Sequence, residues 1–313
     1  MRRLILSNIL LSAAFLAGCG AESIQAPSRS AGPALLERRS ERAFDFTTID
    51  VPGAVFTSAT GINPRGDIVG SYVDNVNGTQ RSHGYVLRDG AFTTIDFPGA
   101  AGTEARGVGP GGEIVGDYWF PGEPAVSVHG YLLTKQGEFV PVNYPGHTNT
   151  IPQRILPDGT ILGCRHDNDT MGSMKGIVIS RDGSSEIDQF ASMNNGATPD
   201  HRRIVGLYTN TMAARQEGYV IDDGVFTPLL VPGSLSTAAW DMNSVGEIVG
   251  VYRNSAGFHG FLLSHDREVY VSIDVPGAAA TRAFGINPRG AVVGSYVVGG
   301  RTHGFLASRM GED

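Results

Sequence analysis

The sequence predicts an all-β chain made of six copies of one unit. A short apolar tripeptide ending in glycine returns at steps of 46, 47, 43, 44 and 44 residues, a period typical of propeller blades rather than of shorter solenoid repeats. Its copies are Ile68-Val69-Gly70, Ile114-Val115-Gly116, Ile161-Leu162-Gly163, Ile204-Val205-Gly206, Ile248-Val249-Gly250 and Val292-Val293-Gly294. Short apolar segments alternate with turn residues and no helical period follows the N-terminal leader, so the expected regular elements are strands.

Each unit is expected to contain four short strands, of which the tripeptide marks the second. The third strand opens with His-Gly or a related dipeptide, at His83-Gly84-Tyr85, His129-Gly130-Tyr131, Lys175-Gly176-Ile177, Glu217-Gly218-Tyr219, His259-Gly260-Phe261 and His303-Gly304-Phe305. The fourth strand precedes a Pro-Gly pair in five units and is expected at 46–51, 92–97, 139–144, 185–190, 226–231 and 270–275. Residues 185–190 fill this place in the third unit, which lacks Pro-Gly.

The segments between these strands carry turn residues. Asn63-Pro64-Arg65-Gly66 and Asn287-Pro288-Arg289-Gly290 suit type I turns, because proline fixes φ at the second position and glycine closes the turn at the fourth. Asp89-Gly90, Asp182-Gly183 and Asp223-Gly224 predict two-residue hairpins between the third and fourth strands, since both residue types tolerate positive φ.

The tripeptide also indicates how the units pack. Successive side chains of a strand point to opposite faces of a sheet, so Ile-Val-Gly places large apolar groups on both faces. A propeller covers both faces by stacking each blade between two neighbours, and the glycine permits close approach of the next backbone. We therefore predict a six-bladed β-propeller with four-stranded blades over residues 44–308, followed by a C-terminal tail at 309–313.

The two ends of the repeat are out of phase with the blade. Residues 44–53 form a Pro-Gly strand with no partner before it, and the repeat finishes at 303–308 with a His-Gly strand that no Pro-Gly strand follows. We expect 44–53 to supply the outermost strand of the last blade, whose inner strands come from about 281–308. This arrangement removes the open seam that a ring of radial sheets otherwise leaves.

Residues 1–18 carry the features of a secretory signal. Met1-Arg2-Arg3 supplies a positive start, and residues 4–17 form an apolar run that is short for a spanning helix. The run ends in Leu16-Ala17-Gly18-Cys19, which resembles the bacterial lipoprotein signal motif, in which the cysteine is lipidated and becomes the mature N-terminus. The resemblance implies a membrane anchor through lipid on Cys19.

Residues 19–43 are expected to form a flexible tether, because prolines, serines and mixed charges leave too little apolar surface for an independent fold. Gly20 follows the cysteine where aspartate signals inner-membrane retention in the same resemblance. The expected location is therefore the bacterial cell envelope, lipid-anchored at the outer membrane, on either its periplasmic or its surface face.

The net charge limits the classes of binding partner, and the cysteine content limits the disulfides that the chain can form. The net charge of −7 includes Arg2 and Arg3 of the leader, so the mature chain is more acidic still, which argues against nucleic acid as a partner. Cys164 is the only cysteine of the folded part, so no disulfide forms within it. We expect Cys164 to be a small buried side chain rather than a reactive thiol.

The unit resembles the bacterial extracellular repeats known as the HAF family. The resemblance rests on Gly61-Ile62-Asn63-Pro64-Arg65-Gly66 with the following tripeptide, on Gly285-Ile286-Asn287-Pro288-Arg289-Gly290 with its own, and on the His-Gly-aromatic segments. It covers residues 44–308. The middle alanine of the family triplet is glycine throughout this chain, and the third and fourth units lose the histidine. Membership implies a secreted, repeat-built β protein without an established activity.

Two sets of residues recur with the unit and are expected to be structural. His83, His129, His259 and His303 occupy one repeat position, and Asp50, Asp96, Asp188 and Asp274 another. A ring of histidines suggests a metal and paired carboxylates suggest glycoside chemistry. Residues that recur from blade to blade are more simply explained by a structural role within each blade. No metal and no cofactor is therefore predicted.

A binding or catalytic site in a near-symmetric ring requires residues that differ between the repeats, and two segments depart from the repeat pattern in this way. The third unit carries His166, Asp167 and Asp169 just past its second strand, and the fourth carries His201 and Arg202 just before its own. We expect these segments to meet at one mouth of the ring, where they suit an anionic or sugar-like ligand. Ordinary drift of two degenerate blades is the alternative.

No signature of a known enzyme class appears, neither a nucleophile elbow nor a zinc, calcium or phosphate-loop motif. The favoured function is therefore an envelope-tethered binding or protein-interaction module, with a small molecule, a glycan or an envelope protein as partner. The alternative is a propeller hydrolase or lyase acting on a carbohydrate or lactone near the third and fourth repeats.

Overall fold

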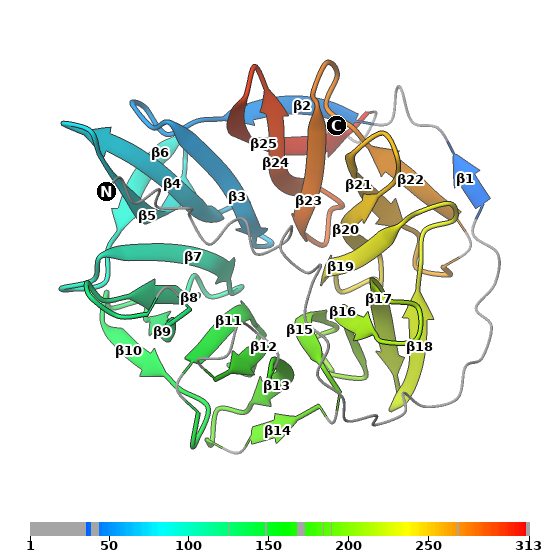
Figure 1. The fold of residues 1–313 in the computed structure, drawn as a ribbon, viewed down its shortest axis with the longest axis horizontal. Helices are drawn as coiled ribbons and strands as arrows, with labels where there is room; N and C mark the ends of the chain where they lie inside the picture. The colour runs from blue at the N-terminus through cyan, green and yellow to red at the C-terminus, as the bar shows by residue number, and fades with distance from the viewer. Residues whose placement is uncertain are drawn as a thin grey trace.

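The computed structural model describes residues 36–38 and 44–310, apart from 125, 148, 168–172, 184, 189 and 268. Within these residues the chain forms six four-stranded antiparallel sheets arranged as a ring (Figure 1), with one further short strand on the outer edge of the fifth sheet. The prediction of a six-bladed β-propeller is confirmed.

The blades follow one another along the chain, and the first three run from the axis outward in chain order. The first is β3 (Phe56–Ile62), β4 (Ile68–Val76), β5 (Thr79–Arg88) and β6 (Ala91–Ile95). The second is β7 (Gly102–Val108), β8 (Ile114–Trp119), β9 (His129–Leu133) and β10 (Phe139–Val142). The third is β11 (Asn149–Ile155), β12 (Ile161–His166), β13 (Lys175–Ile179) and β14 (Ser185–Ile187).

The other three blades also run from the axis outward. The fourth is β15 (Ser192–Ala197), β16 (Arg203–Asn210), β17 (Arg215–Asp222) and β18 (Val225–Leu229). The fifth is β19 (Ser236–Met242), β20 (Ile248–Arg253), β21 (Phe258–Leu263) and β22 (Val269–Ile273). The sixth is β23 (Ala280–Ile286), β24 (Val292–Val298), β25 (Arg301–Arg309) and β2 (Phe44–Ile49).

The N-terminal strand closes the ring as predicted. β2 pairs antiparallel with β25, with Phe46 opposite Ala307 and Ile49 opposite Gly304. In Figure 1 the blue β2 lies along the outside of the red β25. Phe46 also packs its ring against Phe305 at a centroid distance of 5.7 Å. The last blade is therefore built from both ends of the chain.

A second N-terminal strand lies on the fifth blade. β1 (Leu36–Arg38) pairs in parallel with β22, and these three residues fall inside the segment predicted as a tether. The rest of residues 19–43, the predicted signal at 1–18 and Cys19 lie outside the described residues. Among the residues that are described, none belongs to a helix long and apolar enough to cross a membrane.

Both faces of the second strand are buried between blades, as the tripeptide predicts. In the first blade, Ile68 and Tyr85 pack against Val293 of the sixth blade. Val69 points the other way and packs against Ala105 and Ile114 of the second blade. Each fully buried aliphatic side chain contributes about 1.5–3 kcal/mol, so this interleaved packing is the main source of stability in the ring.

The tripeptide glycine makes room within its own blade. A Cβ on Gly70 would lie 1.9 Å from the carbonyl oxygen of Ser58 on β3 and 2.8 Å from the ring of Tyr85 on β5. The close approach that we predicted therefore involves the innermost strand and the aromatic ring of the third strand. This explains why the sequence pairs the glycine with a His-Gly-aromatic segment.

The fourth strands end about two residues earlier than predicted. The residue before the proline turns its N–H away from the sheet and donates it to a threonine in the next innermost strand. The donors and acceptors are Val51 to Thr57 (3.2 Å), Phe97 to Thr103 (2.9 Å), Tyr144 to Thr150 (2.8 Å), Val231 to Thr237 (3.1 Å) and Val275 to Thr281 (3.0 Å). These bonds fix the chain where it passes between blades.

The asparagine of each Asn-x-x-Gly turn organises the turn. In the first blade Asn63 Oδ1 accepts from the N–H groups of Arg65 and Asp67, and Nδ2 donates to the Gly109 carbonyl of the second blade at 3.3 Å. Asp89-Gly90 and Asp223-Gly224 have positive φ at both residues, as expected of tight hairpins. Asp182-Gly183 does not form the predicted two-residue turn, because β13 and β14 end and begin several residues apart.

Candidate functional site

Each innermost strand carries one β-bulge at the same place along its length. The extra residue of each bulge is unpaired in the ladder, which frees its backbone and re-aims its side chain. The six bulged residues, one per blade, are Thr60, Arg106, Gln153, Asn195, Trp240 and Phe284. Five of them line a cavity on the axis, Asn195 being the exception.

The residue that follows each bulge lies where the innermost strands approach one another most closely. Four of the six are glycine: Gly61, Gly107, Gly196 and Gly285. A Cβ on Gly107 would lie 2.5 Å from the carbonyl oxygen of Gln153 in the next blade. The third blade has Arg154 in this place and the fifth has Asp241. At the position after the bulge, one blade therefore carries a cation and another an anion in place of the glycine of the other four.

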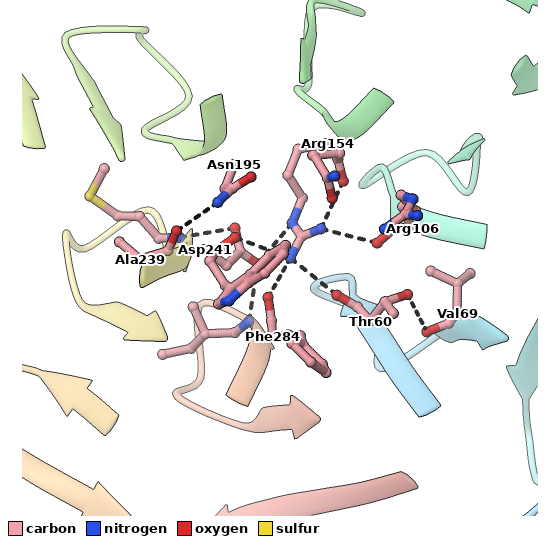
Figure 2. A network of polar contacts seen from close by, with 12 residues as sticks. Thr60, Val69, Arg106, Arg154, Asn195, Ala239, Asp241 and Phe284 are labelled. Carbon is pink, nitrogen blue, oxygen red and sulfur yellow. Dashed lines mark hydrogen bonds and ion pairs between the residues drawn. The ribbon is translucent and has the colours of Figure 1, made fainter. Parts of the chain in front are cut away.

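The guanidinium of Arg154 lies at the axis and contacts residues of several blades (Figure 2). It donates hydrogen bonds to the backbone carbonyls of the bulged residues of five blades. The acceptors are Gln153 (2.7 Å), Arg106 (3.0 Å), Thr60 (3.1 Å), Trp240 (3.5 Å) and Phe284. Bonds from a charged donor are stronger than those between neutral groups, so one side chain ties five blades together.

Asp241 neutralises this buried cation. Its Oδ2 lies 3.2 Å from Nε of Arg154 and accepts the N–H of Ile286 at 3.1 Å, while Oδ1 accepts the N–H of Met242 at 2.9 Å. Burial raises the pKa of the Asp241 carboxyl, and the Arg154 charge acts in the opposite direction. The pair connects the third and fifth blades across the channel.

A cavity of about 410 Å³ lies on the axis above this network. Most of its lining comes from the parts of the innermost strands that precede or form the bulges, so the cavity occupies the half of the channel where those strands begin. Arg154 belongs to the lining and forms its floor. Cavities of this size suit small organic ligands.

One wall of the cavity carries a buried charge cluster from the second blade. Arg106 pairs with Glu104 at 2.9 Å and with Asp117, so two carboxylates share one guanidinium. Burial raises the pKa of Glu104 to about 7, against the attraction of Arg106. Among the described residues, Glu104 Oε1 and Asp117 Oδ2 are buried without a hydrogen-bond partner.

The remaining walls are aromatic and include a second cation. Trp240 and Phe284 meet edge to face at 5.3 Å. The half-buried Arg282 places its guanidinium 4.4 Å from the centre of the Phe258 ring, and burial lowers the pKa of this group. Within the described part of the chain, no carboxylate lies at ion-pair distance from Arg282.

Three of the four recurring histidines bind three of the four recurring aspartates, whereas His129 lies 2.9 Å from Glu123 and Asp188 accepts a hydrogen bond from Ser192. Nδ1 of His83 lies 2.8 Å from Asp96, and His259 and His303 make the same contact with Asp274 and Asp50. Each of these imidazoles also stacks on a tyrosine of the neighbouring strand, as His83 does on Tyr72 at 4.9 Å. The pairs link the third and fourth strands of one blade, which agrees with a structural role.

His166 and Asp167 lie at the end of β12. His166 is 2% exposed, and its Nδ1 donates to the backbone oxygen of Asp167 at 2.8 Å. The Asp167 side chain is half exposed and lies 2.9 Å from Nδ1 of His147, whose hydrogen bond lowers the pKa of Asp167. Asp169 lies outside the described residues.

His201 and Arg202 lie in the turn between β15 and β16. His201 Nε2 is 3.1 Å from Asp158, which precedes β12, and Arg202 makes two hydrogen bonds of 2.7 Å to Asp223. Asp158 and Asp167 flank opposite ends of β12, about 20 Å apart along a six-residue strand. The structure therefore does not bring the two predicted segments together at one mouth.

Two other sequence expectations concern metals and the cysteine. Among the described residues, no three or more His, Cys, Asp or Glu side chains are grouped so that they can hold a metal ion. Cys164 is buried in β12, and burial raises the pKa of its thiol to about 12. This is the environment of a packed side chain rather than of a nucleophile.

The sequence contained a signal for the axial residues. Arg154 and Asp241 stand where the repeat motif Gly-Ile-Asn-x-x-Gly has its first glycine, as at Gly61 and Gly285. A comparison of this one column across the six units singles out both residues. The sequence-based prediction considered the polar loop segments and did not name these two residues, nor Glu104 and Arg282.

No family model and no curated protein matches the chain. Solved structures match in fold. TolB from Acinetobacter baumannii has a TM-score of 0.50 and 16% identity, covering 80% of this chain but only 53% of that one. A putative TolB from Agrobacterium tumefaciens has a TM-score of 0.51 and 16% identity, covering 69% and 80%.

The β-propeller domain of the Trilobed protease from Pyrococcus furiosus has a TM-score of 0.54 and 11% identity, covering 83% of this chain and 95% of that one. That domain has an open velcro topology, whereas β2 closes the present ring. At these identities the comparisons show the propeller fold and nothing about a ligand.

Proposed function

We propose that this protein is a binding module that holds a small organic ligand in the axial cavity. The observation that carries the proposal is the cavity of about 410 Å³, which is lined by Arg154 and by Glu104, whose buried Oε1 has no hydrogen-bond partner. Unpartnered buried polar groups are costly, and a bound ligand that pairs with them removes the cost. Aromatic side chains beside them supply apolar contact.

We further propose that lipid on Cys19 tethers the module in a bacterial cell envelope, at the outer membrane, and that the chain belongs to the HAF family. The lipoprotein-like motif and the repeat motifs support these proposals. Labelling with a radioactive fatty acid in a bacterial host tests the anchor. Loss of the label in a Cys19→Ala variant is the expected result, and a retained label would contradict lipidation at this residue.

The ligand proposal is tested by the melting temperature of residues 40–313 with sugars, sugar acids, lactones, amino acids, metals and a chelator. A ligand at 100 times its Kd stabilises the fold by about 2.7 kcal/mol, which raises the melting temperature by several degrees. Trp240→Ala, which removes a cavity wall, should abolish the shift. Trp119→Phe is the matched control, because Trp119 ends β8 outside the cavity lining. A flat response from a folded ring contradicts the proposal and favours a protein scaffold.

The hydrolase or lyase alternative stays a prediction. His166 is buried and bonded to its own chain, and Asp167 is engaged by His147. If this segment carries out chemistry on a sugar or lactone, Asp167→Ala abolishes turnover while the fold persists. Turnover that survives this substitution places the chemistry elsewhere.

A further inference from the structure

The charges of the axial cavity are divided between two of its walls. On the second blade, the acidic side chains of Glu104 and Asp117 share one guanidinium, that of Arg106, so one of the two acids has no cation of its own. On the sixth blade, Arg282 is a cation without an anionic partner among the described residues. The first blade stands between these two walls around the ring.

Each wall offers one polar group that the described protein leaves unmatched. Glu104 is 3% exposed, lines the cavity and has no hydrogen-bond donor at Oε1. A buried carboxylate oxygen of this kind favours a cationic donor. Arg282 presents a planar fork of N–H donors, which favours a carboxylate.

The surface between these groups is apolar. Trp240 and Phe284 form an edge-to-face pair, and Phe258 covers one side of Arg282. Together with Ile151 and Leu207 they give the cavity an aromatic and aliphatic interior. A neutral sugar would leave Arg282 without a charged partner and would offer no cationic donor to Glu104 Oε1.

We propose that the cavity binds a zwitterionic amino compound with an apolar side chain, whose ammonium group meets Glu104 and whose carboxylate meets Arg282. The proposal rests on the proposed function and names its ligand class. A free amino acid and a short peptide both have this chemistry. They differ in how far the two charges stand apart.

The experiment measures binding of L-alanyl-L-phenylalanine and L-phenylalanine to the full chain by calorimetry, with tryptophan fluorescence as a second signal. Each compound is compared with its N-acetyl form, which lacks the ammonium group, and with its amide, which lacks the carboxylate. The expected result is at least tenfold weaker binding of both blocked forms. Tighter binding of the dipeptide than of the amino acid identifies a ligand with separated charges, and the reverse identifies the free amino acid.

Two conservative variants assign the groups. Arg282→Gln should weaken the free and N-acetyl forms tenfold and leave the amide unchanged. Glu104→Gln keeps an acceptor for Arg106, and should weaken the free and amide forms while leaving the N-acetyl form unchanged. Arg289→Gln, an exposed arginine in the turn before β24, is the control and should change none of them.

The comparison of ligands on the unmodified protein decides the question even if a variant does not fold. Equal binding of free and blocked forms overturns the proposal. So does binding of sugars or lactones in the cavity without any binding of zwitterions, a result that leaves the proposed function standing. Failure of every compound to bind overturns both.

Discussion

Arg154 and Asp241 decide how the innermost strands meet at the axis. Each takes the place of a glycine of the repeat, and together they form a buried ion pair whose cation also holds five backbone carbonyls. Those carbonyls belong to bulged residues and have no partner in their own ladders. Removing either charge therefore leaves several buried groups unsatisfied at once.

Arg154→Met is expected to lower the free energy of unfolding by about 3–5 kcal/mol, because Asp241 and the bulge carbonyls lose their partner. Urea denaturation measures this loss. Addition of Asp241→Asn to the first substitution should cost less than Asp241→Asn alone, since the two residues are coupled. The exposed Arg289→Met is the control. A change below about 1 kcal/mol for Arg154→Met contradicts the structural role given to this network.

At the scale of the element, the blade depends on a glycine beneath an aromatic ring. The second strand carries the glycine, the third strand carries the ring, and the innermost strand brings a carbonyl against both. In the first blade these are Gly70, Tyr85 and Ser58. The three strands are held closer together than any residue with a Cβ allows.

Gly70→Ala is expected to destabilise the fold by about 3 kcal/mol or more, since the added carbon meets backbone that no rotamer change can move. Differential scanning calorimetry measures the change. Gly78→Ala is the control, because Gly78 has open space around it and a φ of +81°. It should cost only about 1–2 kcal/mol from backbone strain. Equal effects of the two substitutions would show that steric contact is not the reason for the tripeptide glycine.

At the scale of the whole molecule, the ring is stable because no blade has a free face. Closure depends on β2, which brings Phe44 and Ile49 into the core of the sixth blade and its neighbour, and on Asp50, which pairs with His303. The closing contacts join residues about 250 positions apart in the chain.

A chain that begins at residue 54 is expected to melt more than about 10 °C below one that begins at residue 40. Burial of each large side chain contributes about 1.5–3 kcal/mol, and several are lost together with the last strand. Thermal denaturation followed by circular dichroism measures the difference. A synthetic peptide of residues 44–53 should restore part of the loss. Equal melting temperatures would contradict closure by this strand.

The amino-acid pattern alone was enough to predict the number of blades, the order of strands within them and the closure of the ring. Each follows from a local pattern repeated six times, such as the tripeptide, or from the phase of that pattern at the ends, as with residues 44–53. Repetition makes these signals strong because every copy solves the same packing problem. The recurring His and Asp positions were predicted as structural for the same reason.

Which irregular residues meet depends on the tertiary structure. His166 and His201 belong to neighbouring repeats, and the sequence predicts that they meet. In the structure His166 is at the C-terminal end of β12, whereas His201 contacts Asp158 before the N-terminal end of this strand. Arg154 and Asp241 are 87 residues apart and yet touch, because the ring brings the innermost strand of every blade to one axis. Contacts across the axis depend on the three-dimensional closure of the whole chain. A local sequence pattern can single out unusual residues, but it does not predict which of them touch.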